Sequence, residues 1–189
     1  LLVTHRVVAV PDAVAAFAAA PPGGAILVVS SLNAVEVLRD APEGNLLARP
    51  FRLVVSAGAG TAKALAAAGV PAVTPELPGA AGILAELARR RESGRLLWPR
   101  GSDADAAPVA ELASRGFDVS APVVYVKEPL PALDAETLRA FRAGEYGAVA
   151  VGSLAALDVF LAALGAKGPE DLPPVRFGVL GPESARLLV

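Results

Sequence analysis

Short apolar runs rich in β-branched residues alternate with longer alanine- and leucine-rich stretches along the whole chain. The runs have the length of strands, and the stretches have the apolar spacing of helices. The predicted strands are residues 25–30, 52–56, 95–98, 119–126, 148–151 and 175–180. The predicted helices are residues 33–38, 60–68, 80–91, 106–115, 133–143 and 154–164. This alternation favours an α/β fold with parallel sheets, helices on both faces and a ligand at the carboxyl ends of the strands.

The chain also contains an internal repeat. The segment 28–37, Val-Val-Ser-Ser-Leu-Asn-Ala-Val-Glu-Val, matches 150–159, Ala-Val-Gly-Ser-Leu-Ala-Ala-Leu-Asp-Val, and 58–65 matches 181–188 at nearly equal spacing. In each copy one predicted strand is followed by a hydroxyl residue that opens a helix. A second strand ends in glycine, followed closely by Thr-Ala or Ser-Ala. We interpret the repeat as a duplication that produced two related halves.

The two halves are unequal in extent. The unit around 95–101, with its helix and the following 116–119, has no partner in the second half. We therefore expect that a strand-helix unit is missing before Leu1 and roughly as much again after Val189. The absence of an initiator methionine points the same way.

Composition excludes several classes of function. A net charge of -2, without a basic stripe interleaved with aromatic residues, argues against nucleic acid as a partner. With no cysteine and one histidine, a disulfide framework, a zinc site and a serine-histidine triad are not expected. The uncharged run 13–35 has the length of a membrane span, but Pro-Pro-Gly-Gly at 21–24 divides it into a helix, a turn and a strand.

Six motifs in their shared order and spacing resemble the uroporphyrinogen-III synthase family across essentially the whole chain. They lie at residues 29–35 (VSSLNAV), 58–62 (GAGTA), 98–101 (WPRG), 123–125 (VVY), 151–154 (VGSL) and 178–185 (GVLGPESA). The resemblance implies two flavodoxin-like α/β domains joined by a two-stranded linker, with the terminal domain incomplete in this chain. Residues 6–124 would form the central domain, 1–5 and 125–128 the linker, and 129–189 part of the terminal domain.

The resemblance also implies a reaction. The family's substrate is hydroxymethylbilane, a flexible linear tetrapyrrole with eight carboxylates, which the enzyme closes with inversion of ring D. The reaction passes through loss of a hydroxyl and a spiro intermediate, and it needs neither a metal nor an organic cofactor. The expected protein is a cytoplasmic monomer that binds this small molecule and neither nucleic acid nor membrane.

The candidate site residues follow from the same comparison. Tyr125 is the expected catalytic residue, because the family's tyrosine at this point assists departure of the hydroxyl or binds the intermediate. The alternative is a half-buried tyrosine at a strand end with its hydroxyl in water. The candidate substrate-binding residues are Ser31, Thr61, Arg100, Gly101, Ser153 and Ser184.

Each substrate-binding candidate has a purely structural alternative. Serine and threonine are favoured helix caps wherever a strand leads into a helix. The helix amino termini at Ser31, Gly60, Ser153 and Glu183 would themselves attract carboxylates through their N–H groups. Arg100 and Gly101 follow a predicted strand, where glycine permits a tight turn that admits a carboxylate or simply reverses the chain.

Several other residues have expected structural roles. Lys63 and Arg186 are expected to face solvent, Trp98 to lie in the core, and His5 to pack in the linker. Gly58-Ala59-Gly60 lacks both the Walker pair and the dinucleotide pattern.

Two other functions remain open from the sequence. One is a non-enzymatic two-lobe ligand-binding or sensor domain derived from the synthase fold. The other is a nucleotide-binding domain of the flavodoxin or response-regulator kind, although no aspartates cluster after a strand.

Overall fold

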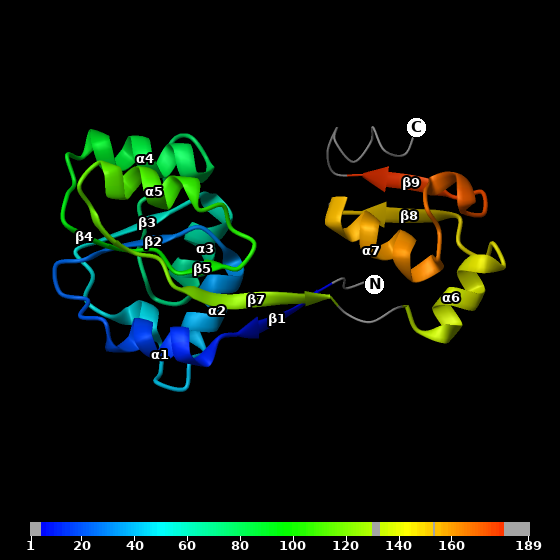
Figure 1. Ribbon diagram of the computed structural model, residues 1–189, viewed down its shortest axis with the longest axis horizontal. Coiled ribbons are helices and arrows are strands. Elements are labelled where there is room, and N and C mark those ends of the chain that lie inside the picture. Colours follow the sequence, from blue (N-terminus) through cyan, green and yellow to red (C-terminus); the bar gives the residue numbers. More distant parts are fainter. Residues whose placement is uncertain (1–4, 130–132, 153, 180–189) are drawn as a thin grey trace. The chain divides into compact units, whose positions relative to one another are not determined.

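The computed structural model describes residues 5–129, 133–152 and 154–179 of the 189-residue chain. The fold is mixed α/β with parallel sheets (Figure 1). Two compact units are present, Val7–Lys127 and Glu128–Val189 with Leu1–Arg6. They are called the large unit and the small unit below. Among the described helices, none combines the length and apolar character needed to cross a lipid bilayer.

The central sheet of the large unit is entirely parallel. Its strand order is β3-β2-β4-β6. The strands are β2 (Ile26–Val29), β3 (Leu53–Ser56), β4 (Arg95–Leu97) and β6 (Asp118–Ser120). A parallel bridge between Val55 and Val73 adds one more segment beside β3. Because the strands share one direction, their carboxyl ends lie along a single side of the sheet, called the carboxyl edge below.

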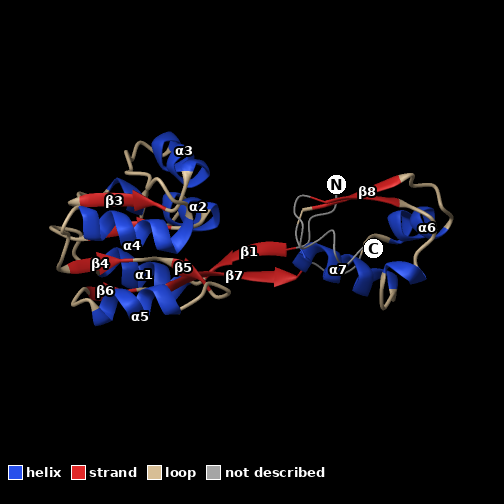
Figure 2. Cartoon of the chain, turned by 90° about the horizontal axis from the view of Figure 1, so that it is seen from above, coloured by secondary structure: helices blue, strands red, loops and turns tan. Residues whose placement is uncertain are grey.

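Helices cover both faces of this sheet (Figures 1 and 2). All four residues of β2 are fully buried, and successive side chains point to opposite faces. Leu27 and Val29 pack in the core formed with α1, α2 and α3, whereas Ile26 and Val28 pack with α4 and α5. The helices are α1 (Pro11–Ala19), α2 (Leu32–Arg39), α3 (Ala59–Ala67), α4 (Gly79–Arg89) and α5 (Ala107–Ser114), with a short 3-10 helix, η1, at Leu46–Ala48.

A second sheet has the order β1-β7-β5, with strands His5–Ala9, Val123–Pro129 and Arg100–Gly101. The prediction of one strand over 119–126 is wrong, because β6 and β7 are separate strands in different sheets. Pro122 lies between them, and its lack of an N–H interrupts the ladder at the change of sheet. Arg100 and Gly101, predicted in a turn, instead form β5, in register with Val123 and Tyr125.

The small unit contains a parallel pair of strands, β8 (Ala148–Val151) and β9 (Arg176–Val179). Helices α6 (Ala135–Arg142) and α7 (Leu154–Leu164) and the short 3-10 helix η2 (Pro169–Asp171) accompany them. Phe141 meets Phe160 edge to face at 5.2 Å between ring centroids and lies 6.2 Å from the ring of Tyr146. These aromatic contacts join the end of α6 to α7.

A carboxylate on α4 is held by two cations. Glu86 accepts hydrogen bonds from Arg89 at 2.7 Å and Arg90 at 2.6 Å, and these bonds lower the pKa of Glu86 to about 2. Its usual pKa is 4.5. A lowered folded-state pKa contributes stability that is fully present above the unfolded pKa and is lost as the pH falls toward the folded one.

We predict that Glu86→Gln removes this pH-dependent part of the stability. The melting temperature of the unchanged protein should fall more steeply than that of the variant between about pH 4.5 and pH 2. Thermal unfolding followed by circular dichroism over this pH range measures the difference. Parallel curves for the two proteins would contradict the prediction.

Candidate functional site

The topology of the central sheet predicts a ligand at its carboxyl edge. After β2 the chain moves to β3 on one side, and it later returns to β4 on the other side. In open parallel sheets, ligands bind beyond the carboxyl ends of the strands at such a point of reversal. Ser30 and Ser31 follow β2 here, and Trp98 follows β4.

Ser31 connects this edge to the second sheet. Its Oγ accepts a hydrogen bond from the backbone N–H of Asn33 at 3.1 Å, so Ser31 is the N-cap of α2. The same Oγ lies 2.8 Å from the hydroxyl oxygen of Tyr125, and either oxygen can donate that hydrogen bond. The capping expected of Ser31 is therefore present, together with a contact that a simple cap does not need.

Tyr125 is buried within β7, with 3% of its surface exposed. The alternative of a half-buried tyrosine with its hydroxyl in open water is wrong, since the hydroxyl is bonded to Ser31. The backbone carbonyl of Tyr125 accepts from the N–H of Ser102 at 3.1 Å. Both ends of the residue are thus fixed by neighbouring elements.

Gly101 is required by the ring of Tyr125. A Cβ at position 101 would lie 2.5 Å from Cζ of Tyr125 and 2.7 Å from its hydroxyl oxygen. Such distances are far inside van der Waals contact, so no larger residue fits without moving the ring. The expected reason for this glycine, a tight turn, is therefore wrong, because Gly101 lies in a strand and its role is to leave space.

Arg100 and Thr61 take no part in this hydrogen bond. The guanidinium of Arg100 donates to the backbone carbonyls of Ala104 at 2.9 Å and Ala121 at 3.4 Å, so it holds loops of its own unit. Thr61 is 8% exposed and lies in the first turn of α3. The N-cap of α3 is Gly58, which has no side chain to cap the helix.

The amino termini of α2 and α3 nevertheless lie side by side. They follow the neighbouring strands β2 and β3, in which Val29 is in register with Ser56, and the N–H of Ala57 donates to Val29. Each amino terminus presents N–H groups and a partial positive charge. The edge can therefore attract an anion although the chain carries a net charge of -2.

Ser153, Ser184 and Arg186 lie outside the described residues. Of the remaining predicted residues, the structure brings together Ser31, Gly101 and Tyr125. Lys63 is exposed, and Trp98 is a core residue with 5% of its surface exposed, as predicted. His5 is partly buried in β1.

Two contacts near Tyr125 were not predicted from the sequence. The indole N–H of Trp98 donates to Oγ of Ser30 at 2.9 Å and joins the ends of β4 and β2. Lys127, two residues beyond Tyr125 in β7, donates to Asp103 at 2.6 Å, and this hydrogen bond raises the pKa of Lys127. No sequence signal identifies either contact, because each joins residues that lie far apart in the sequence.

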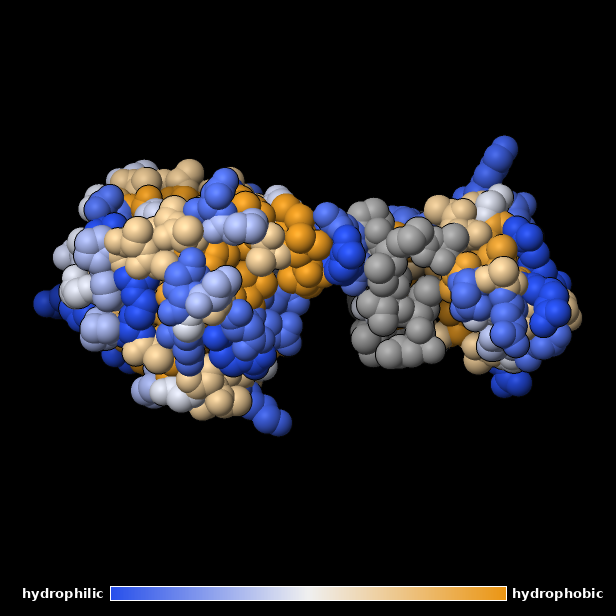
Figure 3. Space-filling view, turned by 90° about the horizontal axis from the view of Figure 1, so that it is seen from below, coloured by the Kyte–Doolittle hydropathy of each residue, from blue (hydrophilic) through white to orange (hydrophobic). Residues whose placement is uncertain are grey.

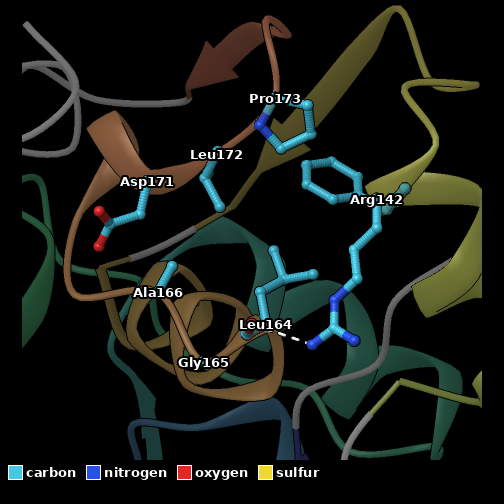
Figure 4. A pocket seen from close by; sticks show the side chains of 8 residues that line it. Arg142, Leu164, Gly165, Ala166, Asp171, Leu172 and Pro173 are labelled. Carbon is cyan, nitrogen blue, oxygen red and sulfur yellow. Dashed lines mark hydrogen bonds between the residues drawn. The ribbon is translucent and has the colours of Figure 1, made fainter.

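Two hollows in the described residues contain none of the predicted side chains. One, of about 390 Å³, lies between β1, α1, α2 and the loop after α2 in the large unit. Figure 3 shows hydrophobic residues gathered on part of the surface of this unit. The other, of about 120 Å³, is in the small unit beside Arg142, whose guanidinium donates to the carbonyl of Leu164 (Figure 4). The candidate site is therefore an edge defined by hydrogen bonds and helix ends.

Comparisons with known proteins agree on one family. A family model described as uroporphyrinogen-III synthase HemD matches residues 4–188. A solved structure of a mutant uroporphyrinogen III synthase from Thermus thermophilus has a TM-score of 0.57 and 22% identity, covering 98% of this chain and 76% of that one. The wild-type enzyme from the same bacterium has a TM-score of 0.50 and 22% identity, covering 97% and 74%. No curated protein sequence matches the chain.

The contact between Gly101 and Tyr125 predicts the outcome of a small substitution. Gly101→Ala should destabilise the protein by about 1–3 kcal/mol, because the new methyl group forces the tyrosine ring away. Thermal unfolding of four proteins tests this: the unchanged chain, Gly101→Ala, Tyr125→Leu and the double variant. The alanine should cost much less in the Tyr125→Leu background, and an equal cost in both backgrounds would show that the ring is not the obstacle.

Proposed function

The chain belongs to the uroporphyrinogen-III synthase family, and we propose that its catalytic centre is built around the Ser31–Tyr125 hydrogen bond at the carboxyl edge. Enzymes of this family are cyclising lyases. The reaction here is closure of hydroxymethylbilane to uroporphyrinogen III, with ring D inverted. The observation that carries the assignment to these residues is the hydrogen bond itself, because it joins a catalytic candidate to a helix amino terminus.

The reaction demands control of geometry more than a strong acid or base. The substituted carbon of ring D must meet the electrophilic methylene, and a correctly held pair of reacting atoms removes much of the entropic barrier. Exposed helix amino termini hold carboxylates without matching each one to a lysine. We therefore assign the amino termini of α2 and α3 to carboxylate arms of the substrate, with Thr61 as an additional hydroxyl donor.

The hydrogen bond also makes one proton available for the departing hydroxyl. Oγ of Ser31 already accepts from Asn33, so its remaining capacity is one donated and one accepted bond. If Ser31 donates to Tyr125, the phenolic proton is free to point toward the substrate. If Tyr125 donates to Ser31, the serine proton is free instead. In either arrangement the pair presents one neutral donor, which suits a substrate that already carries many negative charges.

The rest of the proposal follows from the duplication. Ser153 and Ser184 would be the counterparts of Ser31 and Thr61 in a second flavodoxin-like domain, with 129–189 as part of that domain and 6–124 as the central one. The strand order β3-β2-β4-β6, which reverses between β2 and β4, supports a doubly wound central domain.

Arg100 and Gly101 have indirect roles in this proposal. Arg100 acts through the backbone carbonyls that it binds, and Gly101 acts through the space that it leaves for Tyr125. The working form would be a cytoplasmic monomer without a cofactor.

Incubation with enzymatically prepared hydroxymethylbilane tests the activity. The protein should yield uroporphyrinogen III, whereas unassisted closure yields the symmetric isomer I. Separation of the two isomers after oxidation to porphyrins measures the ratio. If the ratio stays at that of the spontaneous reaction, the activity is refuted, and a non-enzymatic ligand-binding role takes its place.

The role of Tyr125 has its own test. Tyr125→Phe should lower kcat about ten- to a hundredfold, at the lower end of what a positioned proton donor contributes. Ser31→Ala should lower kcat by a smaller factor, because water can replace the serine hydroxyl. Tyr146→Phe is the matched control, since the chain's other tyrosine is exposed in the small unit. An unchanged kcat in Tyr125→Phe would remove this residue from the mechanism.

A further inference from the structure

Two leucines of the large unit are unusual in their exposure. Leu32 exposes 50% of its surface and Leu77 exposes 61%. In the described part of the large unit, every other large hydrophobic residue is at least partly buried. Single exposed leucines are common on protein surfaces and need no explanation. These two leucines need an explanation because of where they lie in the fold.

Leu32 lies at the carboxyl edge beside the proposed centre. It is the first residue of α2 and follows directly after Ser31, whose hydroxyl meets Tyr125. Its side chain therefore stands next to the N–H groups of the first helical turn.

Leu77 lies in a loop at the same edge. The segment around Val73 runs parallel to β3, and the N–H of Gly79 donates to the carbonyl of Ala57, just beyond β3, at 2.8 Å. The loop between them is thus tied to the end of β3, the direct neighbour of β2.

The backbone of this loop is packed closely on α4. A Cβ added to Gly82 would lie 1.7 Å from the carbonyl oxygen of Leu77, so the loop approaches the helix as closely as a glycine permits. The backbone at Leu77 is therefore fixed while its side chain remains in solvent. A rigid support for an exposed apolar side chain is what a ligand contact requires.

We propose that Leu32 and Leu77 form an apolar contact surface for the pyrrole rings of the substrate. This inference rests on the proposed function and adds the part of the site that recognises the ring faces. A linear tetrapyrrole has two kinds of surface, flat apolar ring faces and charged carboxylate arms. The amino termini of α2 and α3 bind the arms, and the two leucines beside them remove ring faces from water.

Steady-state kinetics with hydroxymethylbilane tests the inference. Leu32→Ser and Leu77→Ser should each raise KM about fivefold, and the double variant about twenty-five-fold, because apolar contact area is lost. The kcat values should change less than twofold. Leu32→Met and Leu77→Met, which keep an apolar side chain, should keep KM within about twofold of the unchanged protein.

Leu53→Ser is the matched control. Leu53 is partly buried at the amino end of β3, on the opposite edge of the sheet, so the same substitution there removes packing without touching the proposed surface. Its melting temperature should fall by at least as much as that of the other two serine variants, with KM unchanged. An equal rise of KM in Leu53→Ser would overturn the inference, because the rise of KM would then result from the loss of folding stability and not from the loss of a substrate contact.

The outcomes separate this inference from the proposed function. If the unchanged protein forms only isomer I, the proposed function fails first. If it forms isomer III while Leu32→Ser and Leu77→Ser keep the original KM, the apolar surface is refuted and the activity stands.

Discussion

The parallel pairing of β2 with β3 on one side and β4 on the other is the constraint on which the rest of the large unit depends. It forces β2 to be apolar on both faces, since a helical layer covers each face. It also gathers the strand ends, and the helices that follow them, along one edge. In the proposed site, the partial positive charge of the helix amino termini at this edge would let a protein of slightly negative charge bind a substrate with eight carboxylates.

The catalytic candidate comes from a different sheet, and two small details place it there. Tyr125 reaches Ser31 because β7 pairs with β5 and Gly101 leaves space for the ring. The ring of Tyr125 packs in the apolar core, and its hydroxyl has a partner in the part-buried hydroxyl of Ser31, as buried polar groups require. The position of the hydroxyl is therefore set by packing and by helix capping together, and a change in either would move it.

Elements with a clear apolar period were predictable from the sequence, and those set by tertiary contacts were not. The strand at 148–151 and the helix at 154–164 have the predicted bounds. The predicted strand at 119–126 failed because its apolar residues continue across Pro122, where the chain changes sheets. Within the site, the cap at Ser31 follows from local sequence rules. The requirement for Gly101 arises from a ring 24 positions away in sequence, which no local pattern records.

The proposed site uses neutral donors and apolar contacts instead of a cluster of cations, and this arrangement fits the chemistry of ring inversion. A strong ion pair to each carboxylate would bind the extended and the folded substrate about equally well, and uniform binding does not accelerate the chemical step. N–H groups at fixed helix ends bind the substrate tightly only in the arrangement in which several of its carboxylates reach them at once. The apolar side chains proposed beside those ends add affinity for the ring faces, which lowers KM and leaves kcat nearly unchanged. In the proposed site, a rigid edge of this kind would favour the folded chain in which ring D meets the methylene.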